Sequence, residues 1–564
     1  MKKIVWFLCF MAVIFCFSSC KDMLTVDSDR YKTVDENGLT SANDSVSSML
    51  GLLTGMQRVG ERYLLFGEMR ADLLNVTEYT PADIRSLSDF TVSDTSAYAN
   101  PRDYYTLINN CNYFISRTGD SNSPLIKENA AAHALRAWTY MQLAFNWGHA
   151  YYYTEPLLSV EDTEKDFPVY TASQVIDALI ADLEPLAEAA YPDYGDIYGM
   201  PSRYLFIPVK VLLGDLYLWR GASTDDYEKA AFYYADYIDK NANLASAIAG
   251  QPSMYWSYDN FLLQNFDKSY PSDNWAGLTY ARSTNQELVA AIGMAPSVDQ
   301  GISSHLTGEN MYFYHKTCVY FKPSDVINNL WDDQTYVLHY VSGALATDYY
   351  TMGDTRKQGN SFQGRYYINI NGTTTLFDRL VKLNSAENFM LYRGALLLLR
   401  YAEAVNRAGK PNTAFAVLKY GLDPVTLNDP TRIPESELAD AKPYITVFNN
   451  LKYTFVGNDK GTGIHSRGCG SAPNDQYYVI GGTNGEPLVS VSDTILWVEN
   501  AICDEMALET SFEGNRFQDL MRIAMHRNDP SFLAKRVAAK HGSDYGRIYS
   551  LLMDTKNWYL PEKE

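Results

Sequence analysis

The stretch VKVLLGDLYLWRGASTDDYEKAAFYYADYIDK, residues 209–240, predicts two amphipathic helices joined by a tight turn. Its first half repeats apolar residues every three or four positions, which places Val209, Leu212, Leu213, Leu216 and Trp219 on one helical face. Gly221 follows where a left-handed C-terminal cap is expected, because glycine adopts that conformation without a Cβ clash. Asp225, with Glu228 three residues later, is expected to start the second helix as an acidic capping box.

One helical pair cannot bury its own apolar face, so the chain must supply others. Residues 396–420 repeat this arrangement of two helices, with Gly409 at the expected end of the first helix and Pro411 near the expected start of the second. Residues 130–147 are expected to form a further amphipathic helix. The pairs resemble tetratricopeptide repeats, but long insertions separate them, unlike a regular solenoid. We therefore predict a mainly α fold of tetratricopeptide-like helical pairs, with long irregular loops and a few short strands.

The N-terminus has the features of a targeting segment. Lys2 and Lys3 precede an apolar run at residues 4–17, which is short for a membrane span, and Ser18-Ser19-Cys20 follows. This ending resembles a bacterial lipobox, in which the cysteine is acylated and becomes the mature N-terminus. Lys21-Asp22 is similar to a surface-export signal of Bacteroides-like lipoproteins. Residues 1–19 are thus expected to be a signal peptide, and residues 20–45 a lipidated N-terminus and tether.

We expect residues 46–564 to form a single domain. Its helical pairs are placed near residues 130–147, 209–240, 396–420 and 494–525, and its loop insertions near 251–284, 295–364 and 421–489. Short strands are expected at 285–292, 366–371 and 376–383, the last two pairing with each other.

Composition narrows the possible partners. The formal net charge of −20 over 564 residues disfavours nucleic acid and anionic lipid, since both favour basic surfaces. Beyond the leader, Cys111, Cys318, Cys469 and Cys503 lie far apart without a C-x-x-C pair, so zinc or thioredoxin chemistry is unsupported. Disulfides and buried free thiols both remain open for these four residues.

Several motifs in one order resemble the SusD/RagB family of surface nutrient-binding lipoproteins. Besides Cys20, they are residues 133–147 followed by EPL at 155–157, NQELV at 285–289, LRYAEA at 399–404, FEGNRFQDLMR at 512–522 and NWYLP at 557–561. The chain departs from the family pattern at Gln518, where an aromatic residue is common, and at Tyr401, where leucine is common. The resemblance implies four tetratricopeptide-like pairs on one side of the molecule and loops on the other. It also implies docking on a SusC-like TonB-dependent transporter, with glycans as the usual ligands and peptides as the RagB-like variation.

Sequence motifs for catalysis are missing. The chain has no G-x-S-x-G elbow and no H-E-x-x-H pair, and its eight histidines are scattered, so we expect no enzyme, metal site or cofactor. Paired carboxylates for glycoside cleavage stay open, because Asp and Glu are abundant. The charged residues beside apolar helical stripes are interpreted as structural ion pairs: Arg70, Asp72, Arg400, Glu403, Arg516, Asp519 and Arg522.

Tyrosine is the compositional anomaly, with 44 copies beside nine tryptophans. Aromatic rings stack on the apolar faces of sugars, and neighbouring amides and charged groups bond the hydroxyls. The candidate ligand-binding residues lie in polar loops: Tyr98, Asn100, Arg102, Trp275, Tyr312 and Tyr314. Loop packing or contact with a protein partner explains such aromatic residues equally well.

The sequence therefore favours a lipid-anchored outer-membrane protein that faces outward and delivers an oligosaccharide or polysaccharide to a TonB-dependent channel. Three alternatives stay open. They are an oligopeptide-binding RagB-like lipoprotein, a surface glycosidase, and a scaffold that holds proteins without a small ligand.

Overall fold

The computed structural model shows how these segments pack. It describes residues 42–119, 124–197, 199–250, 285–296, 301–304, 306, 320–342, 345–357, 363–370, 373–380, 382, 388–450, 463–470, 476–482 and 488–562. A continuous buried apolar cluster extends from Met49 to Leu560 and connects helices from both ends of the sequence. Among the described residues, no helix combines the length and the apolar character needed to cross a bilayer.

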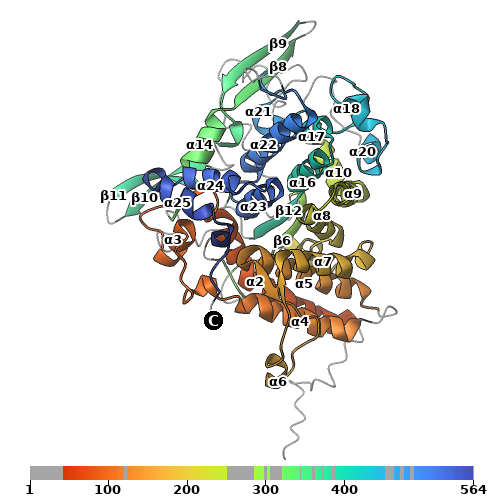
Figure 1. Cartoon of the computed structure of the whole chain (residues 1–564), viewed down its shortest axis with the longest axis vertical. Helices are drawn as coiled ribbons and strands as arrows, with labels where there is room; N and C mark the ends of the chain where they lie inside the picture. The colour runs from red at the N-terminus through yellow and green to blue at the C-terminus, as the bar shows by residue number, and fades with distance from the viewer. Residues whose placement is uncertain are drawn as a thin grey trace, which may run out of the picture.

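Helices dominate the structure, as the sequence predicts. The larger ones are α2 (Ala42–Glu68), α4 (Arg102–Thr118), α5 (Ile126–Trp147), α7 (Ala172–Leu183), α8 (Val209–Arg220), α9 (Thr224–Lys240), α16 (Gly394–Arg407), α17 (Pro411–Lys419), α22 (Val491–Thr510), α23 (Arg516–Arg527), α24 (Pro530–Ala539) and α25 (Tyr545–Leu552). They pack in succession, α4 on α5, α5 on α7, α7 on α8, α8 on α9 and α9 on α16, which in turn packs on α17 and α22 (Figure 1). The result is a curved layer of antiparallel helical pairs.

The turn between α8 and α9 follows the prediction at Gly221 and departs from it at Asp225. Gly221 has φ of +45° and caps α8 in the left-handed conformation. The predicted capping box is wrong, because α9 begins at Thr224 and Ser223 takes the cap position without a side-chain bond. Asp226 closes the turn instead: it pairs with Arg220 at 2.5 Å and accepts a hydrogen bond from the Ala222 N–H at 2.9 Å. A charge-assisted pair with the Arg220 guanidinium binds Asp226 more strongly than a hydrogen bond from a single backbone N–H at a helix cap would.

The turn between α22 and α23 crosses α2 closely. Its residues 511–515 include Gly514, which has φ of +94°. A Cβ at Gly514 would lie 2.6 Å from Cε1 of Tyr63, so glycine is required for both the conformation and the space. The second helix of the pair predicted near residues 494–525 begins directly after this turn, at Arg516.

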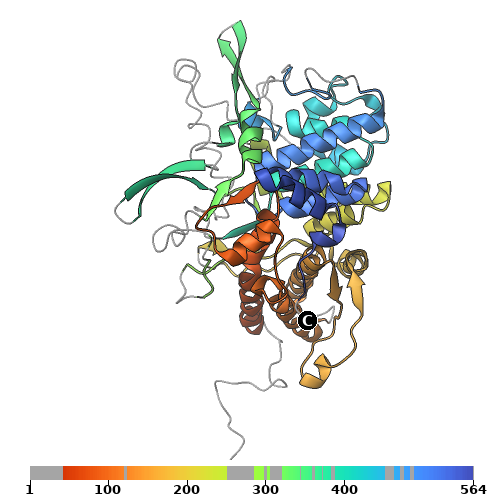
Figure 2. The ribbon, with the colours of Figure 1, turned by 60° about the vertical axis from the view of Figure 1, so that its left-hand side comes forward.

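The strands form separate two-stranded antiparallel sheets. β6 (Leu288–Ile292) is a fully buried strand, as expected from the sequence, and it pairs with β12 (Phe389–Arg393). The predicted hairpin also forms, with β10 (Gln363–Ile370) paired to β11 (Thr373–Leu380) and Tyr367 opposite Leu376, but each of its strands begins three residues earlier than predicted. A second hairpin, β8 (Thr335–Ser342) with β9 (Leu345–Met352), lies inside the insertion where no element was predicted. Threonine, aspartate and tyrosine interrupt its apolar residues, so the period of two is weak. In Figure 2 both hairpins, coloured green to teal, project away from the cyan and blue helices.

Short elements complete the fold. They are β1 (Leu74–Val76), α3 (Ala82–Asp89), η1 (Ala97–Ala99), β2 (His149–Tyr151), α6 (Val160–Thr163), β3 (Val169–Thr171), η2 (Glu184–Leu186), β4 (Asp196–Ile197), β5 (Met200–Pro201), η3 (Ser202–Leu205), α10 (Ala242–Gly250), β7 (Phe321–Pro323), α14 (Asp325–Asp332), η6 (Thr355–Lys357), α18 (Pro424–Leu427), α19 (Glu435–Leu438), α20 (Pro443–Thr446), η7 (Val447–Asn450), α21 (Ser466–Cys469), η8 (Gly542–Asp544) and η9 (Thr555–Trp558). β1 pairs with β7, β2 with β3 and β4 with β5.

Candidate functional site

A tight turn carries the first predicted site residues, Tyr98, Asn100 and Arg102. The side-chain oxygen of Ser96 accepts a hydrogen bond from the Tyr98 N–H at 3.2 Å and thereby caps η1. Asn100 Oδ1 then accepts one from the Arg102 N–H at 3.0 Å, where α4 begins. These local side-chain to backbone bonds fix the course of the chain through the turn.

The turn is also held against α2. Arg62 donates hydrogen bonds to the Asn100 carbonyl at 3.0 Å and the Ala97 carbonyl at 3.3 Å, and it forms an ion pair with Asp103 at 3.3 Å. Three contacts from one guanidinium leave the turn little freedom. A ligand that binds here would find the backbone already ordered.

The three side chains differ in accessibility. Arg102 is exposed, Asn100 is half-buried, and Tyr98 is half-buried with its ring edge-on to Phe66 at a centroid distance of 6.0 Å. Burial raises the pKa of Tyr98, so its hydroxyl is neutral at physiological pH and can both donate and accept a hydrogen bond. The turn thus presents a neutral hydroxyl and a cation.

Sequence reasoning did not identify the aromatic residues beside this turn. Tyr105 follows Arg102 by one helical turn, and its hydroxyl accepts a hydrogen bond from the Tyr151 N–H at 2.9 Å. Tyr105 stacks on Tyr153 at 6.4 Å, and the Tyr151 side chain is 42% exposed at the end of β2. The consecutive tyrosines at 151–153, directly after a helix, were the available signal. These residues extend the candidate surface from the turn along α4 to β2.

A second exposed aromatic pair lies elsewhere. Tyr350 on β9 and Tyr477 have ring centroids 4.7 Å apart, and their side chains are 44% and 42% exposed. Figure 1 places β9 and α4 at opposite ends of the long axis. No single small ligand can therefore touch both aromatic groups, although a long polymer can.

The other predicted residues, Trp275, Tyr312 and Tyr314, lie outside the described residues, as does the predicted lipidation site, Cys20. Their roles stay predictions from the sequence.

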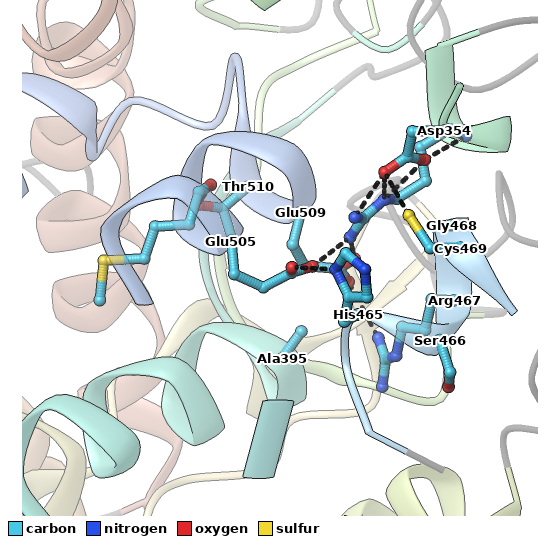
Figure 3. A network of polar contacts seen from close by, with 12 residues as sticks. Asp354, Ala395, His465, Ser466, Arg467, Gly468, Cys469, Glu505, Glu509 and Thr510 are labelled. Carbon is cyan, nitrogen blue, oxygen red and sulfur yellow. Dashed lines mark hydrogen bonds and ion pairs between the residues drawn. The ribbon is translucent and has the colours of Figure 1, made fainter. Parts of the chain in front are cut away.

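The buried core contains an ionic network that joins distant segments (Figure 3). Glu509 on α22 accepts hydrogen bonds from Arg356 at 2.8 Å, Arg393 at 2.8 Å and Arg467 at 2.9 Å. Burial alone would raise the pKa of Glu509, but these arginines hold it well below its usual range. Glu509 is therefore ionised and serves as a structural counter-ion.

The network continues on both sides of Glu509. Arg356 also binds Asp354 at 2.7 Å and Glu505 at 2.8 Å. Glu505 Oε2 accepts a hydrogen bond from Nδ1 of His465 at 2.8 Å. All of these side chains are almost completely buried, so no substrate can reach them in this structure. The arrangement fixes the segments around η6 and α21 to α22.

The charged helical motifs have the structural role that the sequence indicated. Arg516 binds Asp72 at 2.8 Å, and Arg522 binds Glu403 at 2.6 Å and Asp519 at 2.8 Å. Arg70 is the exception: within the described part of the chain, its guanidinium has no carboxylate partner. It donates instead to the Asn146 side chain at 3.3 Å and to the Trp558 carbonyl.

Cys111, Cys469 and Cys503 are free, buried thiols, while Cys318 lies outside the described residues. Burial raises the pKa of all three, that of Cys111 to about 12, which makes them unreactive at neutral pH. Within the described residues, no group of three or more His, Cys, Asp or Glu side chains could hold a metal ion.

Comparisons with known proteins agree with the motifs and the fold. The model of the SusD family matches residues 310–559. SusD-like protein P38 of Formosa agariphila is 22% identical over 429 residues, which cover 71% of this chain and 78% of that protein.

Solved structures share the fold. A SusD superfamily protein from Bacteroides vulgatus has a TM-score of 0.55 at 13% identity, covering 92% of this chain and 95% of its own. A SusD homologue from Bacteroides thetaiotaomicron has a TM-score of 0.53 at 16% identity, covering 91% of both chains. NanU of B. fragilis has a TM-score of 0.50 at 16% identity, covering 90% of this chain and 94% of its own.

The fold is built on tetratricopeptide-like helical pairs, and the comparisons support the class of SusD-like nutrient-binding proteins. Residues 310–559 resemble the SusD/RagB family, and the described chain shares the fold of SusD superfamily structures.

Proposed function

We propose that this protein is a lipid-anchored outer-membrane protein that captures an oligosaccharide or polysaccharide and delivers it to a SusC-like TonB-dependent transporter. The observation that carries the ligand class is the ordered turn at Tyr98, continued by the exposed Tyr151. The match of residues 310–559 to the SusD family supports the class of nutrient-binding protein. The lipobox at Cys20 supports the anchor.

The chemistry of this surface suits a sugar. The rings of Tyr98, Tyr105 and Tyr151 offer apolar faces for pyranose rings, and Arg102 offers donors for hydroxyl groups. Because Arg62 holds the turn in place, binding costs little backbone entropy. Trp275, Tyr312 and Tyr314 remain further candidates from the sequence.

Affinity electrophoresis of the purified full-length protein in non-ionic detergent, against a panel of polysaccharides, tests the ligand class. We expect one polysaccharide to retard the protein. Tyr151→Ala and Arg102→Ala should each reduce the retardation, because a stacked aromatic or a hydrogen-bonding cation contributes about 1 kcal/mol or more, a fivefold or greater loss of affinity.

Tyr545→Ala is the matched control. Tyr545 is 40% exposed on α25 and stacks on Tyr549 at 5.9 Å, so it resembles Tyr151 in exposure and chemistry at a different place. Its replacement should leave retardation unchanged. Equal loss in all three variants would contradict the proposed site, and binding of a peptide pool with no retardation by any polysaccharide would favour the oligopeptide alternative.

We propose a binding role without catalysis. The polysaccharide should be recovered at its original length after prolonged incubation with the protein. Shortened products, lost on replacement of one Asp or Glu, would establish the glycosidase alternative.

Membrane fractionation tests both the lipid anchor at Cys20 and the TonB-dependent transporter as a partner. The native protein should co-purify with a TonB-dependent transporter from the outer membrane, and Cys20→Ala should appear in the soluble fraction. A Cys20→Ala protein that stays in the membrane would contradict the anchor. Co-purification without a ligand in any screen would favour the scaffold alternative.

A further inference from the structure

A pocket of about 330 Å³ lies between the end of α3 and the C-terminal segment. Arg70, Phe90, Val92, Lys556, Asn557 and Tyr559 contribute to its wall. Its volume is at the lower end of the range for small-molecule sites, about 300–1,000 Å³. It shares no lining residue with the turn at Tyr98, and the inference below does not depend on the proposed function.

Arg70 gives the pocket its unusual feature. The side chain is 1% exposed and lies over the Phe517 ring, with its guanidinium carbon 4.2 Å from the ring centroid. Its hydrogen bonds go to the neutral acceptors Asn146 and Trp558, and no carboxylate of the described residues lies within ion-pair distance. In the buried networks described above, arginines have one or more carboxylate partners, so Arg70 stands apart.

The uncompensated charge has an energetic consequence. Moving an arginine out of water is costly unless an anion accompanies it. Burial lowers the pKa of Arg70 to about 9, so the group is still protonated at neutral pH. An anion that enters the pocket would supply the missing partner.

The remaining wall restricts the kind of anion. No aspartate or glutamate lines the pocket among the described residues, and Lys556 adds an exposed cation at its edge. Asp89, Asp554 and Glu562 lie close to lining residues in the sequence but are not part of the wall. Glu562 pairs with His149 at 2.7 Å, and Asp554 Oδ1 accepts the Lys556 N–H at 3.1 Å. Phe90 and Tyr559 supply aromatic surface, and Asn557 supplies an amide whose nitrogen donates to the Leu551 carbonyl.

The backbone of Phe90 is also unusual. Phe90 has φ of +55°, a left-handed conformation that is rare for a bulky residue, and its N–H closes α3 by donating to the Ser86 carbonyl. The fold thus places an aromatic side chain in this wall despite a local cost.

We propose that this pocket binds a small monocarboxylate carried on a ring, of the size of a hexuronic acid. The carboxylate pairs with Arg70, and the ring lies against the aromatic wall. A singly charged anion matches the single buried cation, and the volume accepts one ring rather than a chain of them.

Calorimetric titration of the purified full-length protein in detergent tests the proposal with D-glucuronate, D-glucose and inorganic phosphate as probes. Glucuronate should bind saturably with one site. Glucose lacks the carboxylate and should bind at least about tenfold more weakly, because charge-assisted hydrogen bonds are about twice as strong as neutral ones. Phosphate should also bind more weakly than glucuronate, because it has no ring to contact the aromatic wall.

Three variants locate the site. Val92→Trp fills the pocket and should abolish glucuronate binding, and Lys556→Met should weaken it about threefold or more. Arg70→Gln should abolish it as well, provided that circular dichroism shows a folded protein. Lys535→Met removes an exposed lysine from α24, outside the pocket, and should leave the affinity unchanged.

Four results would overturn the proposal. They are no saturable binding of glucuronate, equal binding of glucose, tighter binding of phosphate, and undiminished binding by a folded Val92→Trp protein. Because Val92 and Lys556 lie at the partly or fully exposed edge, these variants test the site even if Arg70→Gln does not fold.

Discussion

Several buried arginines in this protein pair with carboxylates far away in the sequence. The pairs include Arg516–Asp72 at 2.8 Å, Arg400–Asp215 at 2.7 Å and Arg393–Glu509 at 2.8 Å. Each pair brings together segments that only the complete fold makes adjacent. Removing one member would leave the other buried and unpaired, which is more costly than losing the attraction itself.

Glu68 is a buried carboxylate whose pKa is raised by burial, whereas the arginines beside Glu509 lower the pKa of that residue. Its side chain is fully buried at the end of α2 and accepts a hydrogen bond from the Gly514 N–H at 2.8 Å. Burial raises the pKa of Glu68 from 4.5 to about 7. Between these two pH values the folded state holds a proton that the unfolded state has lost, so this residue makes stability fall as pH rises.

Glu68→Gln should therefore stabilise the protein at pH 8 and have little effect near pH 4.5. The glutamine keeps an acceptor for Gly514 and removes the buried charge, which corresponds to at most about 3.5 kcal/mol at roughly 1.4 kcal/mol per pKa unit. Urea unfolding at both pH values measures the difference. Glu435→Gln, at an exposed position on α19, is the control and should change stability equally little at each pH. A Glu68→Gln gain that is no larger at pH 8 would contradict the assignment.

At the scale of elements, two serines occupy the same cap position with different contacts. Ser490 begins α22, and its side-chain oxygen accepts the Asp493 N–H at 3.1 Å. Ser223 precedes α9 without such a bond, because Asp226 and Arg220 close that turn. The serine side chain therefore contributes to the free energy of unfolding at the start of α22 but contributes little at the start of α9.

Ser490→Ala should lower the free energy of unfolding by about 1 kcal/mol, the usual cost of losing a capping side chain. Ser223→Ala, which is equally exposed, should change it by less than about 0.5 kcal/mol. Thermal or urea unfolding of both variants checks the comparison. Similar losses in the two variants would show that the cap bond at Ser490 contributes nothing.

At the scale of the whole molecule, the ionic network fixes insertion segments to the helical layer. Glu509 on α22 receives Arg356 from η6, Arg393 from the end of β12 and Arg467 from α21. One carboxylate therefore connects three segments that are separated in sequence. The β8–β9 hairpin, which projects from the helices in Figure 2, ends just before η6 and therefore lies next to this network in the sequence.

Glu509→Gln should destabilise the protein by about 3–5 kcal/mol, since it leaves buried arginines with an uncompensated charge. Hydrogen exchange should rise first in residues 354–357 and 463–470, which depend on this contact. The exposed Glu435→Gln again provides the control. Unchanged exchange in both segments would mean that other contacts hold them.

The helical layer was predictable because its period is local. Apolar spacing, Gly221, Gly409 and Pro411 identified the two central pairs, and the buried strand at β6 and the β10–β11 hairpin were also predicted. The β8–β9 hairpin and helices α24 and α25 were missed. In the hairpin, polar residues weaken the apolar period, so pairing across the turn decides its structure.

The candidate site was only partly predictable. Composition and loop position selected Tyr98, Asn100 and Arg102, but the contributions of Arg62, Tyr105 and Tyr151 depend on how α2, α4 and β2 pack. Trp275, Tyr312 and Tyr314 still rest on the sequence alone.

The sequence by itself determined the helical pairs and the SusD-like motifs, and it predicts the lipid anchor, because each of these patterns depends on neighbouring residues. The tertiary structure alone decided which charges are compensated. In the fold, Asp72 pairs with Arg516, whereas Arg70, two residues away in the sequence, has no carboxylate partner among the described residues. An ion pair forms between charged groups that are close in space. Helices that pack in the core bring such groups together from distant parts of the sequence, so no local sequence pattern predicts the pair.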